Sequence, residues 1–390
     1  MTDNAIIWLD RAIDRAFQQG ISDIHLDFVD SPPYELNVRV RRSGDLTAWP
    51  PLHGNDARSV VSRIKSLANV GSGTTRKPEE GRYLHRIGAG SLSPDLEAAD
   101  YEELSAVLPR SDLRLVVLPT IRGEKQVLRL PSIAHTPRIN ELGFSQKNLK
   151  LVANLLGWAN GLVLFAGPVG AGKTTSMYSV LEFLGGSAKA VYSVEDPVER
   201  TLENVDQLEV NEGAGNTFAS MLKSLRRADL QVLMIGEIRD KETAYSAIQI
   251  SVAGARVVSS IHANDSVAAV EAMLALSGAN PQQIMQSLRG VISQRLVKKA
   301  HADCRGRGKL DDGIVCAACN GTGVDGRVAI HEVLPITPEF SEAVVRGASR
   351  HELTAVARAS GMITLREDAQ RRLDSGETTA AWLTEVLGIE

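Results

Sequence analysis

A glycine-rich segment near the middle of the chain has the residue types and the spacing of a phosphate-binding loop. Residues 167–174 satisfy the pattern G-x-x-x-x-G-K-[ST]. The glycines allow backbone N–H groups to converge on phosphate oxygens, Lys173 supplies a cation to the terminal phosphates, and Thr174 offers a hydroxyl ligand for Mg²⁺. An apolar run precedes the segment and a helical pattern follows it, so the positive end of a helix would meet the anion. We therefore expect a nucleoside-triphosphate site formed by Gly167, Pro168, Val169, Gly170, Ala171, Gly172, Lys173, Thr174 and Thr175.

Polar residues follow three other short apolar runs and could complete this site. Glu237 ends one run, and a parallel neighbouring strand would place its carboxylate beside the γ-phosphate, where a base orients the attacking water. Glu195, Asp196 and Glu199 follow a second run, at the edge where parallel sheets bind their ligands. His262 follows a third run. From these residues alone, a strand-end carboxylate, a solvated acidic loop and a structural histidine remain open alternatives.

All three cysteines of the chain fall within one short segment, residues 301–326. Cys316 and Cys319 form a C-x-x-C pair, and His301 and Cys304 form an H-x-x-C pair upstream of it. Two such pairs suit tetrahedral coordination of Zn²⁺ by sulfur and imidazole ligands. We expect a structural Cys₃His zinc site, with free thiols or a redox-active thiol pair as the alternatives.

Composition and charge exclude several classes of protein. The chain has 43 Lys and Arg against 47 Asp and Glu, a formal net charge of −4, whereas a dedicated nucleic-acid binder would usually be basic. Hydrophobic residues make up 43% of 390 positions, enough for more than one buried core. Residues 1–20 carry charges inside their apolar stretch, so we expect no signal peptide, and no apolar run approaches the roughly 20 residues that span a bilayer. A cytoplasmic multi-domain protein is expected.

The N-terminal third of the chain has the pattern of an α+β domain. Apolar residues recur at helical spacing over residues 4–17 and 56–70. Strand patterns are clearest where Leu36, Val38 and Val40 alternate with polar residues, and they cover residues 21–28, 34–41, 113–118 and 126–130. We expect this domain to occupy residues 1–132, with residues 88–111 as a loop or insertion, and residues 133–146 to form a linker.

Beyond the linker, from residue 147 to residue 390, short apolar strands alternate with helical segments. Strands are expected at 162–166, 190–194, 232–235 and 256–260, and helices at 173–183, 218–227, 241–251 and 266–276. This alternation predicts a parallel sheet with both faces covered. From about Pro281 we expect a mostly helical C-terminal part, interrupted by the cysteine-bearing loop.

Taken together, the four polar segments resemble the signatures of the secretion-ATPase superfamily, which powers type II secretion, type IV pili and related systems. Those signatures are a Walker A loop, an Asp box, a Walker B segment ending in G-E-I-R-D and a His box. Here they read GPVGAGKTT, SVEDPVE, VLMIGEIRDKETA and SSIHAN. The resemblance implies an α/β chain in which a PAS-like N-terminal α+β domain precedes a RecA-like P-loop ATPase domain.

The resemblance also implies roles for individual residues. Glu237 would be the catalytic base, and His262 would lie close to the phosphates. The acidic residues of the Asp box would contribute to the Mg²⁺ and water network, namely Glu195, Asp196 and Glu199. Arg114 and Arg129 match positions whose side chains reach nucleotide phosphates across a domain or subunit boundary, and Arg227 matches a further phosphate-directed arginine.

Two departures from the family pattern stand beside these matches. Residues 227–231 lack the proline that the family usually carries before Walker B, and the chain starts directly at the PAS-like domain, where larger assembly ATPases have an additional docking domain. The cysteine loop resembles that of assembly and secretion members, with His301 in place of the first of four cysteines. Retraction ATPases generally lack this loop.

The resemblance therefore implies a homohexameric ATPase that uses ATP, Mg²⁺ and a structural Zn²⁺. It would lie in the cytoplasm, peripherally associated with the inner membrane, and drive polymerisation of pilins or pseudopilins through a membrane platform protein and other machinery components. A pilus retraction or conjugation-type secretion ATPase is one alternative. A RecA-like nucleic-acid translocase is another, although the charge balance and an aromatic content of 4% speak against direct nucleic-acid contacts.

Overall fold

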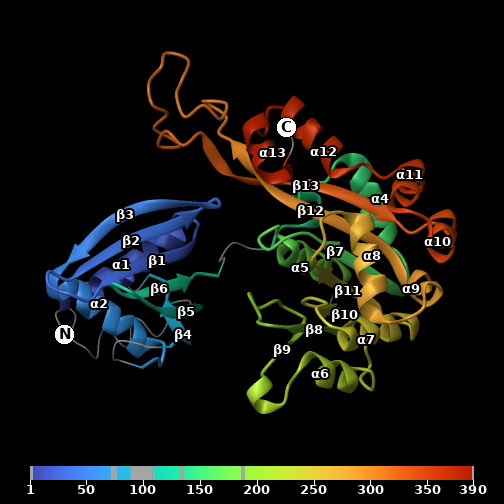
Figure 1. Ribbon diagram of the computed structural model, residues 1–390, viewed down its shortest axis with the longest axis horizontal. Helices are drawn as coiled ribbons and strands as arrows, with labels where there is room; N and C mark the ends of the chain where they lie inside the picture. Colours follow the sequence, from blue (N-terminus) through green and yellow to red (C-terminus); the bar gives the residue numbers. More distant parts are fainter. Residues whose placement is uncertain are drawn as a thin grey trace. The chain divides into compact units, whose positions relative to one another are not determined.

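The chain divides into two units, Met1–Ala134 and His135–Glu390, each with its own hydrophobic core (Figure 1). The computed structural model describes residues 3–71, 77–88, 108, 110–131, 136–185 and 189–388. Among these residues no helix is both long enough and apolar enough to cross a membrane.

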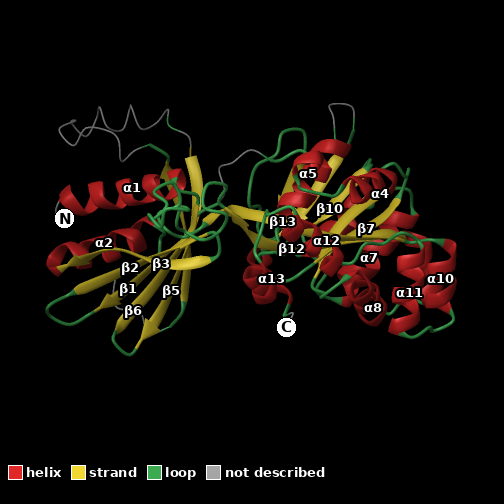
Figure 2. Cartoon of the chain, turned by 90° about the horizontal axis from the view of Figure 1, so that it is seen from above, coloured by secondary structure: helices red, strands yellow, loops and turns green. Residues whose placement is uncertain are grey.

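In its described residues, the first unit is an antiparallel sheet with helices α1 and α2 on one face (Figure 2). Its strand order is β3-β2-β1-β6-β5-β4. The elements are α1 (Asp3–Gln18), β1 (Ile21–Val29), β2 (Glu35–Arg42), β3 (Asp45–His53), α2 (Gly54–Leu67), β4 (Glu79–Arg86), β5 (Arg110–Thr120) and β6 (Gly123–Arg129). Along β2 the apolar side chains are buried under the helices and the intervening polar ones lie on the opposite face, as the alternation predicts.

The sequence patterns miss two strands of this sheet. The strand β3 contains Pro50 and Pro51, which are tolerated because it is an edge strand, and β4 is a polar strand at the other edge. The predicted loop at 88–111 lies largely outside the described residues, and its last two residues begin β5.

The second unit is built on a sheet of order β13-β12-β7-β11-β10-β8-β9, parallel except for the β12–β13 pair. Its strands are β7 (Gly161–Ala166), β8 (Val191–Glu195), β9 (Asp206–Glu209), β10 (Val232–Ile235), β11 (Arg256–Ile261), β12 (Leu288–Ala300) and β13 (Val324–Pro335). Every residue of β7 and β10 is buried, because helices cover both faces.

Helices cover the two faces of this sheet in separate groups. On one face pack α4 (Gln146–Leu156) and α5 (Lys173–Leu184). On the other pack α6 (Phe218–Leu225), α7 (Lys241–Val252), α8 (Ser266–Ser277), α9 (Pro281–Ser287), α10 (Pro338–Val345) and α11 (Arg350–Ala359). The chain ends with α12 (Leu365–Asp374) and α13 (Ala380–Leu387), which pack on β12 and β13, and short turns of 3₁₀ helix lie at Ile139–Glu141 and Glu212–Ala214.

The expectation of a mostly helical C-terminal part is wrong for two long segments. Strands β12 and β13, of 13 and 12 residues, pair antiparallel on either side of the cysteine loop. Most of β12 is buried on both faces, so it lacks the polar alternation that marks a half-exposed strand. Helices do follow from Pro338 onward.

Residues 136–145, from the predicted linker, belong to the second unit and pack against its β13 and α12. The Phe144 ring lies against the His331 ring at 4.0 Å between centroids. Arg372 of α12 donates to the backbone carbonyls of Gly143 and Ala329. His331 is buried, and desolvation together with Arg372 and its neighbour lowers its pKa to about 3, so the imidazole is neutral.

One buried carboxylate joins the starts of two helices in the second unit. Glu332 of β13 accepts hydrogen bonds from the backbone N–H of Ser266, the first residue of α8, at 2.7 Å, and from that of Leu365, the first residue of α12, at 3.2 Å. Burial raises the pKa of Glu332, while these donors favour its charged form. The carboxylate therefore satisfies N-terminal donors of two helices that are distant in sequence.

Candidate nucleotide site and Cys–His cluster

The phosphate loop lies between β7 and α5, as its sequence pattern predicts. Gly170 and Gly172 have φ angles of 77° and 85°, which glycine adopts without strain. Lys173 is the first residue of α5, and its Nζ donates to the carbonyls of Gly167 at 2.8 Å and Pro168 at 3.0 Å. The Lys173 ammonium group is thus held against the phosphate loop. Desolvation and the charge of Arg295 lower the pKa of Lys173, whereas Glu237 acts to raise it.

Glu237, His262 and Arg239 form a charged group at the carboxyl ends of β10 and β11. A Glu237 carboxylate oxygen lies 3.2 Å from Nε2 of His262, and the other carboxylate oxygen accepts from the guanidinium of Arg239. Arg239 also approaches Asp196 at 3.8 Å. The hydrogen bond to Glu237 raises the pKa of Arg239, so this cation stays charged. Glu237 and His262 are therefore in direct contact at this edge of the sheet.

The strand order differs from one expectation. The strand that carries Glu237, β10, is not the neighbour of β7; β11, which carries His262, lies between them. The expected adjacency of the Glu237 strand and the phosphate-loop strand is therefore wrong. Because the strands are parallel, Lys173, His262 and Glu237 nevertheless follow the carboxyl ends of three consecutive strands.

The three acidic residues of the Asp box have different surroundings: Glu195 is buried, whereas Asp196 and Glu199 are exposed. Glu195 is only 2% exposed, and its carboxylate accepts hydrogen bonds from Tyr178 at 2.5 Å, Ser193 at 2.6 Å and Gln207 at 3.0 Å. Burial and the Glu195 charge raise the pKa of Tyr178 above its usual range, so Tyr178 remains a donor. Asp196 is about half exposed beside Arg239.

The remaining predicted arginines lie on β5, on β6 and just after α6. Arg114 of β5 and Arg129 of β6 are cross-strand partners in the first unit, on the sheet face opposite its helices. Nε of Arg129 lies 3.1 Å from a carboxylate oxygen of Asp23, and Arg129 remains 72% exposed. Arg227 is exposed just after α6.

Sequence reasoning misses two side chains of β12 that contact the loops of this site. The Gln294 amide donates to the Ala171 carbonyl and accepts from the Ser176 hydroxyl, both at 2.7 Å. The Arg295 guanidinium donates to the Asn264 carbonyl at 2.7 Å. The only signal in the sequence is that Gln294 and Arg295 form a polar pair inside an otherwise apolar run. This signal is too weak to identify them as site residues.

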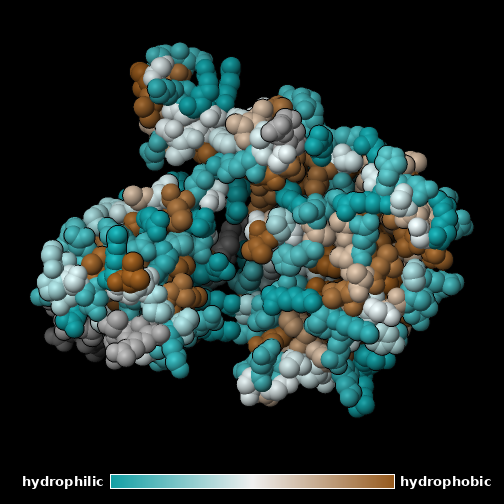
Figure 3. Space-filling view, viewed as in Figure 1, coloured by the Kyte–Doolittle hydropathy of each residue, from teal (hydrophilic) through white to brown (hydrophobic). Residues whose placement is uncertain are grey.

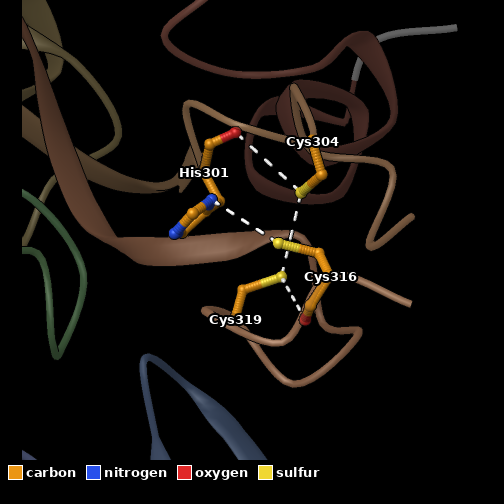
Figure 4. A group of neighbouring side chains, drawn as sticks. All are labelled: His301, Cys304, Cys316 and Cys319. Carbon is orange, nitrogen blue, oxygen red and sulfur yellow. Dashed lines mark hydrogen bonds between the residues drawn. The ribbon is translucent and has the colours of Figure 1, made fainter. Parts of the chain in front are cut away.

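His301, Cys304, Cys316 and Cys319 gather in the loop between β12 and β13 (Figure 4). Their ligand atoms all lie within 4.8 Å of one another, with sulfur atoms of Cys304 and Cys319 at 3.8 Å and Nδ1 of His301 3.9 Å from the Cys316 sulfur. Sulfur ligands about 2.3 Å from a tetrahedral Zn²⁺ lie about 3.8 Å apart. The donor set and its spacing therefore fit a zinc ion. Ile314 and Val315 of this loop are exposed. Figure 3 shows a few hydrophobic residues on the otherwise mostly hydrophilic surface of the loop between β12 and β13.

Comparison with known proteins gives consistent matches. The family model for type II/IV secretion system proteins matches residues 99–388. Type II secretion system protein HxcR of Pseudomonas aeruginosa is 35% identical over 384 residues, which cover 97% of this chain and 75% of HxcR. The type IV pilus assembly ATPase PilB of Thermus thermophilus is 33% identical over 398 residues, which cover 97% of this chain but 42% of PilB. The chain thus spans less than half of that relative.

Among solved structures, the ATPase DotB of Legionella pneumophila has a similar fold. Its TM-score is 0.69 at 17% identity, and the match covers 97% of this chain and 95% of DotB. At this identity the likeness shows the α/β fold alone.

Proposed function

This chain belongs to the type II/IV secretion system protein family and is an ATPase, and we propose that it is the motor of a type II secretion or type IV pilus assembly system. The observation that carries the proposal is the phosphate loop with Lys173 beside a Glu237–His262 pair at one sheet edge. We further propose that the first unit is PAS-like, the second is RecA-like, and the working form is a cytoplasmic homohexamer attached to the inner membrane through a platform protein.

In the proposed reaction, water attacks the γ-phosphate and ADP leaves. Glu237 orients the water and accepts its proton, while Lys173 stabilises the charge that develops on the phosphate oxygens. The hydroxyl of Thr174 and the exposed carboxylate of Asp196 would hold Mg²⁺, which supplies further neutralisation of the phosphates; Glu199 is a third candidate ligand. The Glu195 carboxylate already accepts three hydrogen bonds from side chains. We therefore propose that Glu195 holds the segment that carries Asp196 and Glu199.

Arginines complete the proposed charge stabilisation. Arg114 and Arg129 are proposed to donate to phosphate oxygens of a nucleotide bound in the assembled ring, with Arg227 as a further contributor. Their support is that Arg114 and Arg129 are cross-strand partners on the sheet face opposite the described helices, together with the family resemblance.

The test of the proposed motor is stimulation of ATP hydrolysis by its membrane partner. We expect the protein to hydrolyse ATP faster with vesicles that contain the platform membrane protein of its secretion or pilus system than with empty vesicles, because the load-bearing partner is part of the working cycle. Single- and double-stranded DNA form the second arm of the experiment. No response to the membrane protein, combined with faster hydrolysis on DNA, would replace the motor with the nucleic-acid translocase.

We also propose that the Cys–His cluster binds one structural Zn²⁺, with His301 as the fourth ligand. Protein purified without chelators should contain about one zinc per chain by elemental analysis, because four ligands close the coordination sphere. His301→Ala should lose zinc and loosen the C-terminal region while the phosphate loop still binds ADP. His351→Ala, an exposed histidine on α11, is the matched control and should keep its zinc.

The two results separate the parts of this proposal. Wild-type protein without zinc would remove the metal site. Undiminished zinc in His301→Ala would leave a site in which a nearby oxygen ligand, such as that of Asp303, takes the fourth position.

A further inference from the structure

Two consecutive residues of β12 connect the separate loops of the nucleotide site. Gln294 is 2% exposed and Arg295 is 8% exposed. Side chains of consecutive strand residues point to opposite faces, so one strand can serve two loops. Buried polar groups are costly unless they are hydrogen-bonded. Each of these side chains donates to a loop carbonyl, Gln294 to that of Ala171 and Arg295 to that of Asn264.

Gln294 controls the direction of a peptide group in the phosphate loop. Its side-chain NH₂ group donates to the backbone carbonyl of Ala171 at 2.7 Å. Its side-chain oxygen accepts from the hydroxyl of Ser176 in α5. The peptide bond between Ala171 and Gly172 is trans and planar, so its C=O and N–H point in opposite directions. Fixing the carbonyl against Gln294 therefore turns the N–H of Gly172 away from the core, toward the side on which the loop receives phosphate.

The packing around this contact is close. A Cβ atom at Gly172 would lie 2.8 Å from the side-chain amide nitrogen of Gln294. One at Gly167 would lie 2.6 Å from the backbone carbonyl oxygen of Gln294. The phosphate loop therefore rests directly on β12, and Gln294 fixes its conformation before any nucleotide binds.

Arg295 joins strand β12 to the loop that follows β11. Its guanidinium donates to the backbone carbonyl of Gln294 at 2.9 Å and to the backbone carbonyl of Asn264 at 2.7 Å. Asn264 is two residues after His262, whose ring contacts Glu237. A planar guanidinium can hold two carbonyls in fixed directions, whereas an ammonium group is a single point charge. Arg295 thus fixes the segment that places His262 against Glu237.

From these contacts we propose that Gln294 and Arg295 are positioning residues of the nucleotide site, with separable roles. Gln294 preorganises the phosphate loop for binding, and Arg295 aligns His262 and Glu237 for turnover. This inference rests on the proposed ATPase site and assigns different roles to two residues that act through the backbone of its loops.

The test for Gln294 is its replacement by methionine, which keeps the length and packing of the side chain but not its hydrogen bonds. Gln294→Met should raise the KM for ATP and weaken binding of fluorescent ADP by about tenfold, with kcat changed by less than about twofold. Ser287→Ala is the matched control, because it removes a buried hydroxyl that bonds only the carbonyl of Ile284. Unchanged ADP affinity in Gln294→Met would overturn the role of Gln294.

The test for Arg295 uses Arg295→Lys, which keeps the charge but cannot span both carbonyls, together with Arg295→Met. Both should lower kcat about tenfold or more at nearly unchanged KM and ADP affinity. Wild-type kcat in Arg295→Lys would mean that only the charge matters, and a raised KM without loss of kcat would mean a direct contact with nucleotide. Either result overturns the positioning role.

Two further readouts keep these tests separate from folding and from the proposed function. Thermal unfolding and ADP binding show whether each variant is folded, and if Arg295→Met does not fold, Arg295→Lys decides. Failure of the wild-type protein to hydrolyse ATP would contradict the proposed function, whereas normal hydrolysis by wild type and by every variant would contradict only this inference.

Discussion

Lys173→Ala is expected to abolish ATP hydrolysis. The substitution removes the cation that the loop carbonyls of Gly167 and Pro168 hold in place before nucleotide arrives. Without it, the charge that develops on the phosphate oxygens loses its preorganised partner. Steady-state hydrolysis by the purified full-length protein measures the effect, with Lys150→Ala, an exposed lysine of α4, as the control that should retain wild-type activity. Near-normal turnover in Lys173→Ala would remove the phosphate-loop assignment.

Glu237→Gln is expected to separate binding from hydrolysis. The amide keeps the size of the side chain and can still hydrogen-bond His262, but it cannot accept the proton of the attacking water. We expect ATP binding to be retained and kcat to fall by about 10²-fold or more. Nucleotide affinity and turnover, measured on the same preparation, test both parts.

The control for this substitution is Glu242→Gln, an exposed glutamate in the first turn of α7. It makes the same chemical change in the same region and should hydrolyse ATP normally. If Glu237→Gln also hydrolyses at the wild-type rate, Glu237 is only a strand-end carboxylate that balances the charge of Arg239.

The sequence predicts those parts of the site that are formed by residues close together in the chain. The phosphate loop is recognisable because its glycines, its lysine and the helix that follows are neighbours in sequence. The helix starting at Lys173 and the strand ending at Ile235 begin and end where the apolar spacing places them. The placement of Glu237 near His262 follows from two strands ending at one sheet edge.

The rest depends on pairing between distant segments. The insertion of β11 between β7 and β10 is a property of the sheet order, which no single strand encodes. The burial of Glu195 depends on Tyr178 and Gln207, from two other elements. Strand β12 lacks polar alternation because both of its faces are covered, and for that reason its Gln294 and Arg295 do not stand out as site residues.

The double role of Glu332 has a mechanical consequence for the second unit. Moving the first turn of α8 without α12 would break a hydrogen bond to a buried carboxylate, at a cost of about 1–3 kcal/mol. The first turns of α8 and α12 are therefore expected to shift together, because both are hydrogen-bonded to the Glu332 carboxylate. Since α8 begins just after the His262 loop, a displacement at the nucleotide edge would reach α12 directly through this carboxylate rather than through the residues between the two helices.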